Sequence, residues 1–141
     1  MYDTSLTHQA LPTSRYLYLL GVAVSVFASN NGFIIENILR TEKTYEWDKL
    51  VDLESGRLLP YISATISSKA GKDIEELFER IVELRNRIVH GFRITSECGE
   101  QILATKERGK NNRFDIDEDY LLEFIRLNDE LSQKLIAFRG F

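Results

Sequence analysis

The stretch DIEELFERIVELRNRIVH, residues 73–90, decides the fold of this chain. Its apolar residues recur at steps of three and four, the spacing that places side chains on one face of an α-helix. Acidic residues fill its first turns and basic residues its last, which complements the helix macrodipole. Gly91 follows directly and suits a C-terminal helix cap. The apolar face consists of Ile74, Leu77, Phe78, Ile81, Leu84 and Ile88.

Further helical patterns precede this stretch. The first begins after Thr13 or Ser14, either of which can cap it. The Asn-Asn-Gly run at 30–32 predicts a break, although the apolar stripe resumes after it, so one long kinked helix is the alternative. We expect a short helix over residues 44–53. Another is expected over residues 60–71, with proline in its first turn and glycine at its end.

A small β-structure is predicted after the helix of residues 73–90. Residues 101–107 and 112–116 have the pattern of two short strands joined by a glycine-containing turn. A last helix is expected from residue 117 or 119 to about residue 138. The predicted fold is therefore all-α: an up-and-down helical bundle with a small β-hairpin inserted before the last helix.

The composition is typical of one globular domain, which we expect to cover residues 1–141. Hydrophobic residues make up 43% of the chain and charged residues 28%. Cys98 is the sole cysteine, so no intrachain disulfide can form, and with two histidines the chain has too few ligands for a structural zinc site. No cofactor and no metal are expected, and a reducing, cytoplasmic setting is the natural interpretation.

Neither a secretory signal nor a membrane segment is predicted. The N-terminus lacks a basic start. The most apolar run, residues 17–28, is shorter than the ~20 residues that span a bilayer, so we interpret it as part of a buried helix.

Three residues near the end of the 73–90 helix are candidates for chemistry. Arg85 falls inside the apolar stripe, where it either forms a salt bridge with an acid on a neighbouring helix or points into a cleft to bind a phosphate. His90 is either a helix cap or an acid/base group, because its unperturbed pKa of ~6.5 allows proton transfer near neutrality. Asn86 lies one helical turn before His90 and could orient the imidazole or contact a substrate.

The spacing of these residues poses a geometric difficulty. Positions five apart on a straight helix differ by roughly 140° in direction, so Arg85 and His90 do not point the same way. They converge on one cleft only if the helix end loosens at Gly91, or if a second copy of the chain completes the site.

Arg85-Asn86-Arg87-Ile88-Val89-His90 resembles the signature of the HEPN ribonucleases: arginine, a polar residue, three further residues, then histidine. Its place at the end of a long helix, late in a helical bundle, is also similar to that family. The resemblance implies a homodimer whose motif helices face each other and cut RNA without a metal. It implies catalytic roles for Arg85, Asn86 and His90, with the RNA 2′-hydroxyl as the nucleophile.

The resemblance also implies a role as a toxin or an antiphage effector. Some HEPN toxins carry a tyrosine two residues after the histidine, and a partner enzyme modifies its hydroxyl. This chain has Phe92 there, which has no hydroxyl. We therefore expect control by a binding antitoxin or a sensing partner protein.

RNA binding would require a local basic surface, because the net charge of the chain is −4. The candidate contacts are Arg87, Arg93, Lys106, Arg108, Lys110 and Arg113. For the residues of the hairpin tip, a solvated turn is the alternative interpretation. Two alternatives stand beside the enzyme: a non-catalytic binding module for RNA or protein, and a purely structural interaction protein.

Overall fold

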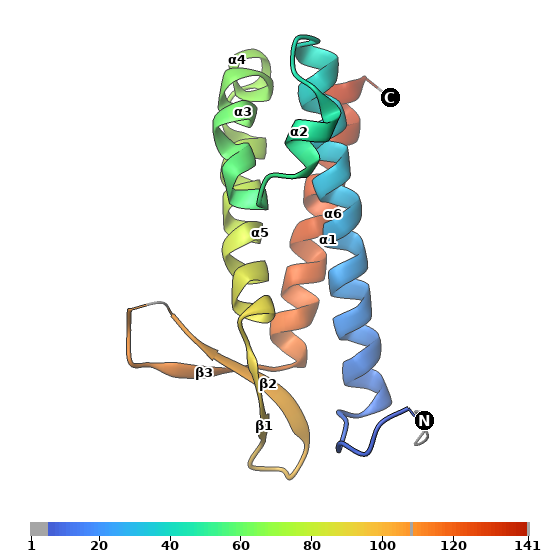
Figure 1. Ribbon diagram of the computed structural model, residues 1–141, viewed down its shortest axis with the longest axis vertical. Helices are drawn as coiled ribbons and strands as arrows, with labels where there is room; N and C mark the ends of the chain where they lie inside the picture. The colour runs from blue at the N-terminus through green and yellow to red at the C-terminus, as the bar shows by residue number, and fades with distance from the viewer. Residues whose placement is uncertain (1–5, 108, 141) are drawn as a thin grey trace.

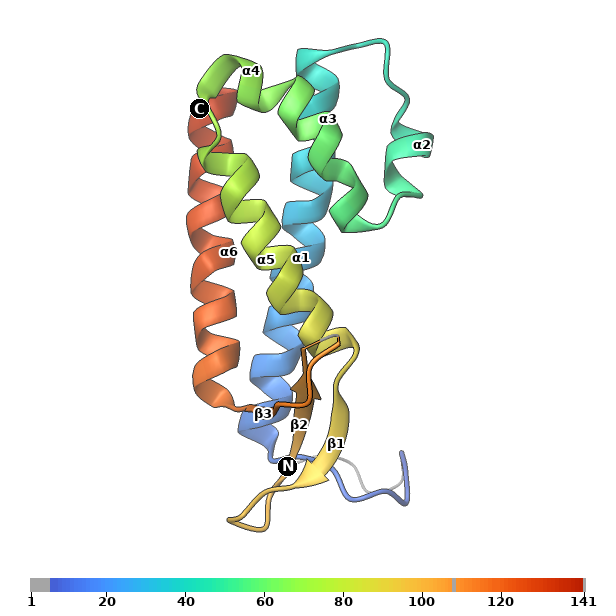
Figure 2. The same cartoon turned by 90° about the vertical axis from the view of Figure 1, so that its left-hand side faces the viewer.

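Three long helices form the body of the molecule, of which the computed structural model describes residues 6–107 and 109–140. They are α1 (Ser14–Thr41), α5 (Asp73–Val89) and α6 (Glu118–Arg139). Figures 1 and 2 show that α1 and α6 run side by side in the same direction, whereas α5 runs opposite to both. The helices predicted over residues 73–90 and from residue 117 or 119 to about 138 are therefore confirmed to within a few residues, and α1 begins after Thr13 as expected.

Short helices cover one end of this body. After α1 the chain forms four short helices in order: α2 (Trp47–Val51), the 3-10 helix η1 (Ser55–Leu58), α3 (Leu59–Ala64) and α4 (Ile66–Ala70). The single helix predicted over residues 60–71 is wrong, because the chain divides at Thr65. The Thr65 hydroxyl donates to the Tyr61 carbonyl at 2.6 Å, a side-chain bond that competes with regular helix geometry.

A three-stranded antiparallel sheet occupies the other end, so all-α is not accurate as a description of the fold. Its strands are β1 (Phe92–Thr95), β2 (Gln101–Lys106) and β3 (Arg113–Ile116), with β2 in the centre. The predicted hairpin corresponds to β2 and β3, in which Lys106 lies opposite Arg113. Strand β1 was not predicted; it pairs with β2 in a register that sets Phe92 opposite Ala104.

Helix α1 is continuous through the predicted break at residues 30–32. Tertiary partners satisfy both asparagines there. The buried Asn30 amide donates to the backbone carbonyl and the side-chain oxygen of Asn128 on α6, at 2.8 and 3.0 Å. Asn31 accepts a 2.7 Å bond from Ser55. Their polar groups thus fasten α1 to its neighbours instead of ending it.

The core lies between the three long helices. Phe27 of α1 stacks on Phe78 of α5, with 6.3 Å between ring centroids, and packs at 6.2 Å against Phe124 of α6. At the sheet end, the buried Tyr16 hydroxyl donates to the Ile116 carbonyl at 2.6 Å and accepts from the Leu103 N–H at 3.0 Å. One side chain of α1 therefore holds both β2 and β3 against the bundle.

Helix α1 is long and apolar enough to cross a membrane, judged by length and composition alone. A core helix passes the same test. Nine of its residues are buried within the molecule, and α6 is its main packing partner.

Candidate functional site

An open cleft lies where α5 ends and the sheet begins. Its volume is about 660 Å³. Three of the residues predicted from the motif helix line it, namely Asn86, Arg87 and His90. Lys106 of β2 lines it too, although it is distant in sequence. The structure therefore brings four of the predicted site residues together; the remaining lining residues are Phe92 and Gly109.

The end of α5 is shaped by a close approach between backbones. His90 is the C-terminal cap residue, and its N–H donates to the Asn86 carbonyl at 2.9 Å. Gly91 does not adopt the left-handed conformation typical of a glycine cap. A Cβ on it would instead lie 3.2 Å from the Ala104 carbonyl of β2 and 3.1 Å from that of Ile88. Glycine is needed here so that the chain can turn from α5 into β1, which pairs with β2. The His90 side chain, just before this turn, is exposed.

Basic groups along the cleft are held by the sheet. The Arg87 guanidinium donates to the Lys106 carbonyl, which ties α5 to β2. The Lys106 ammonium donates to the Lys110 carbonyl at 3.0 Å. Lys110 itself forms a 2.8 Å ion pair with Glu107, and this hydrogen bond lowers the pKa of the Glu107 carboxyl. Lys110 is thus partly neutralised, whereas the cleft keeps the charges of Arg87 and Lys106.

Arg85 does not line this cleft. Its guanidinium lies over the Phe27 ring of α1, 5.1 Å from the centroid. Its Nε is buried without a hydrogen-bond partner among the described residues. Burial lowers the pKa of Arg85, and the charge of Glu54 opposes that shift. No ion pair of Arg85 exists in the described part of the chain, so the predicted salt bridge to a neighbouring helix is wrong.

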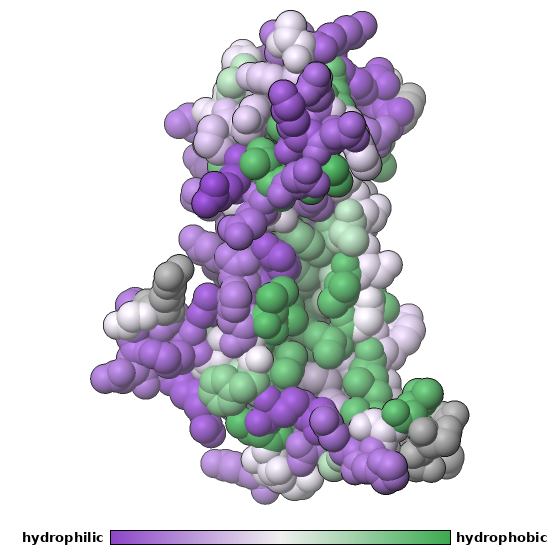
Figure 3. Space-filling view, in the orientation of Figure 1, coloured by the Kyte–Doolittle hydropathy of each residue, from purple (hydrophilic) through white to green (hydrophobic). Residues whose placement is uncertain are grey.

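An apolar band lies beside this arginine. Val24 precedes Phe27 by one turn of α1, and Val89 follows Arg85 by one turn of α5. Because the two helices run in opposite directions, both valines lie on the sheet side of the Arg85–Phe27 contact. Each is 59% exposed. Figure 3 shows apolar surface between α5 and α1 in this region. We call it the α1–α5 band.

Arg93, Lys110 and Arg113, which were also predicted to contact RNA, are not among the residues that line the cleft. The Arg93 guanidinium donates to the Ala10 carbonyl and, at 3.2 Å, to Gln101, so it fastens the N-terminal segment to the sheet. Arg113 is exposed near the turn of the hairpin. Arg108 lies outside the described residues.

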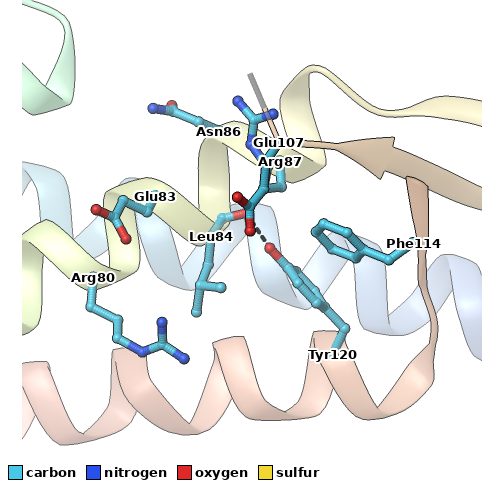
Figure 4. Close-up of a pocket in the computed structure, with 8 residues that line it drawn as sticks. All are labelled: Arg80, Glu83, Leu84, Asn86, Arg87, Glu107, Phe114 and Tyr120. Atoms are coloured by element: carbon cyan, nitrogen blue, oxygen red, sulfur yellow. Dashed lines mark hydrogen bonds between the residues drawn. The ribbon is translucent and has the colours of Figure 1, made fainter. Parts of the chain in front are cut away.

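A second pocket of about 420 Å³ adjoins the cleft and shares Asn86 and Arg87 with it. In Figure 4, Arg80 and Glu83 project from α5 on one side, and the rings of Phe114 and Tyr120 stand on the other. The Tyr120 hydroxyl donates to the Leu84 carbonyl at 2.8 Å. Burial raises its pKa to about 12, against the opposing charges of Arg87 and Arg80. The complete lining is Arg80, Glu83, Leu84, Asn86, Arg87, Glu107, Phe114 and Tyr120.

This pocket was not predicted, although the spacing of its charged residues on α5 is visible in the sequence. Arg80, Glu83, Arg87 and His90 follow one another at steps of three, four and three, which places them along one polar face of α5. Phe114 and Tyr120 line the pocket from β3 and α6, and no local sequence pattern predicts that these two elements meet α5 there.

No cluster of three or more histidine, cysteine or acidic residues suited to a metal ion occurs among residues 6–107 and 109–140. Comparisons with models of known protein families, with curated proteins and with solved structures find no match.

Proposed function

We propose that this protein is a HEPN-type endoribonuclease that cleaves RNA without a metal at a site shared by two copies of the chain. The observation that carries the proposal is the open cleft at the end of α5. It combines an exposed histidine, an amide and two basic side chains. Such a set can bind a phosphodiester and move protons, the two requirements of RNA cleavage by transfer to the 2′-hydroxyl.

A second copy supplies what one copy lacks. Arg85 lies at the α1–α5 band and forms no salt bridge among the described residues, while His90 opens onto the cleft. A twofold axis through this band covers the exposed Val24 and Val89, whose burial favours association. The same packing brings Arg85 of the partner subunit toward the end of α5. The occupant we propose for the band is therefore a second copy of this chain.

The reaction proceeds by attack of the RNA 2′-hydroxyl on the adjacent phosphorus. One His90 accepts the proton of that hydroxyl, and the partner subunit's His90 gives a proton to the leaving 5′ oxygen as its bond to phosphorus breaks. Arg85 and Arg87 stabilise the negative charge on the phosphoryl oxygens. The products are a 2′,3′-cyclic phosphate and a 5′-hydroxyl. DNA is not a substrate, because it lacks the nucleophile.

The cellular role that fits this activity is that of a toxin or an antiphage effector in the cytoplasm. Phe92 lies in the cleft without a hydroxyl to modify. A protein that covers the cleft, as an antitoxin or a sensing partner, is the mode of control that we favour.

The decisive experiment is cleavage of a mixed RNA pool in EDTA by the wild type, His90→Ala and His8→Ala. The last variant is the matched control, because His8 is the other histidine of the chain and is exposed away from the cleft-lining residues. We expect His90→Ala to abolish cleavage and His8→Ala to retain it, with cyclic-phosphate ends on the products. Equal cleavage by all three proteins, or ends of another type, would rule out the proposed mechanism.

The dimer has its own test by light scattering. Val89→Asp places a charge in the α1–α5 band, whereas the control Val51→Asp changes an exposed valine on α2. We expect the first variant to be monomeric and inactive and the second to behave as the wild type. A monomeric wild-type protein that still cleaves RNA would exclude the shared site.

A non-catalytic binding module is the second candidate, and the position of Arg85 over Phe27 favours it. A guanidinium held against an aromatic ring contributes to packing rather than to phosphate binding. In that case RNA or a protein ligand binds equally well to the wild type and His90→Ala, and neither cleaves.

A further inference from the structure

Two charged side chains that line the pocket beside the cleft form no ion pair among the described residues. Arg80 and Glu83 lie three positions apart on α5, a spacing that permits an ion pair, yet neither forms one among the described residues. The charge of Arg80 helps to lower the pKa of Glu123, but the Glu123 carboxylate is already bound by Arg126 at 2.5 Å, and that hydrogen bond is the main cause of the lower pKa. A hydrogen-bond acceptor and a donor therefore face one cavity without internal partners.

The opposite wall is aromatic. Phe114 and Tyr120 pack against each other with 6.2 Å between ring centroids, and both are only partly buried. The Tyr120 hydroxyl already donates to the Leu84 carbonyl. A ligand can therefore contact the faces and edges of the two rings. The volume of about 420 Å³ is within the roughly 300–1,000 Å³ range of small-molecule sites. A planar aromatic ligand with polar edges fits such a wall.

The two charged groups determine which hydrogen-bond donors and acceptors the edges of the ligand must carry. A carboxylate has two oxygens that only accept, so Glu83 pairs best with two adjacent N–H donors. Guanine is the base that offers them, at N1 and at the 2-amino group. A guanidinium only donates, and guanine also offers the adjacent acceptors O6 and N7. Adenine, cytosine and uracil present no pair of adjacent donors to a carboxylate.

The pocket is continuous with the catalytic cleft. Asn86 and Arg87 line both cavities, so a nucleotide with its phosphate beside Arg87 has its base within reach of the neighbouring space. Glu107 also lines the pocket, but its carboxylate is held by Lys110 at 2.8 Å, which leaves Glu83 as the available acceptor.

We propose that this pocket binds a guanine base of the RNA next to the bond that is cut, with Glu83 on its Watson–Crick edge and Arg80 and the aromatic wall holding the ring. This inference rests on the proposed ribonuclease function and adds a base preference to it.

The first test is cleavage of single-stranded oligonucleotides that differ at one position beside the cut, where guanosine is replaced by inosine or adenosine. We expect guanosine to be preferred over adenosine by roughly 5- to 150-fold, the effect of one good bidentate base contact. Inosine, which lacks the 2-amino group, should fall between them. Glu83→Gln should bring the three substrates toward equality, because an amide cannot accept from both donors. Glu79→Gln, an exposed glutamate on α5 outside the pocket, is the matched control and should keep the preference.

The second test does not depend on cleavage. Binding of guanosine and adenosine monophosphates is compared by NMR titration of the wild type, Glu83→Gln and Glu79→Gln. Tighter binding of the guanosine nucleotide that Glu83→Gln alone removes supports the pocket even if no RNA is cut, a result that would reject only the enzyme. Cleavage with no base preference, together with equal binding of both nucleotides, overturns the guanine site and leaves the proposed ribonuclease function standing.

Discussion

Replacing Tyr16 with phenylalanine removes a single oxygen atom that joins three elements. The side chain is 2% exposed, and its hydroxyl donates to the Ile116 carbonyl at 2.6 Å while it accepts from the Leu103 N–H at 3.0 Å. Burial raises the pKa of this phenol, as expected for a group held in its neutral form. Phenylalanine fills nearly the same space, so the loss of hydrogen bonding dominates the effect of the change.

The magnitude follows from the two backbone groups left without the hydroxyl. A buried polar group that loses its partner costs about 1–3 kcal/mol. The contact of the Leu103 N–H is only part-buried, so water partly replaces the hydroxyl there, and the two groups together give roughly 2–4 kcal/mol. Since the net stability of a domain is roughly 5–15 kcal/mol, this is a large share of the total.

Urea denaturation followed by circular dichroism measures the effect, with Tyr18→Phe as the control. Tyr18 lies on the same helix and is 64% exposed, so its replacement should change the free energy of unfolding by less than about 0.5 kcal/mol. Hydrogen exchange should also accelerate at the Leu103 amide in Tyr16→Phe alone. Equal stability of the two variants would refute the assignment of Tyr16 as the connection between α1 and the sheet.

Three further predictions concern other parts of the bundle. Gly91→Ala places a Cβ 3.2 Å from the β2 backbone and should lower the free energy of unfolding by about 1–3 kcal/mol in a thermal melt. Gly32→Ala meets open space inside α1 and should raise the free energy of unfolding by about 0.5–1 kcal/mol. Changes in stability of the same sign in both variants would contradict the close packing at Gly91. Asn30→Ala removes the amide that donates to Asn128 and should cost about 1–3 kcal/mol in urea denaturation; an unchanged midpoint would show that this contact contributes nothing. The pKa of Tyr120 is about 12 in the native state and 10.0 in the reference state, so its contribution is complete below pH 10.0 and is lost as the pH rises through about 12. As the pH rises from 10 to 12, the free energy of unfolding measured in urea should therefore fall less for Tyr120→Phe than for the wild type. An equal fall in both proteins would contradict the raised pKa of Tyr120.

Much of the bundle could be predicted because its signals are local. The pattern and charge polarity of α5 predicted that helix to within one residue. Helix α6 begins after Asp117, one of the two expected starts, and the Asp117 side chain accepts from the Tyr120 N–H at 2.9 Å. The errors arose where distant partners outweigh local preference. Asn30 should end a helix on propensity, yet its bond to Asn128 on α6 holds it inside one.

The candidate site shows the same division. Asn86, Arg87 and His90 share a helix end, so their proximity follows from sequence spacing. Lys106 joins them only because β2 is central in the sheet and accepts a bond from Arg87 at its backbone carbonyl. Strand β1 escaped prediction although its alternating Phe-Arg-Ile-Thr pattern and the following turn at Gly99 were present.

Periodicity, caps and turn residues act over a few positions, and these local signals are sufficient to predict α5, α6, the β2–β3 hairpin and the motif at the end of α5. Contacts between separate elements placed Arg85 over Phe27, and they set Arg80 and Glu83 opposite Phe114 and Tyr120. The physical reason is that a side chain's direction is set by its helix, whereas what it meets depends on how separate helices and strands bury their apolar faces together.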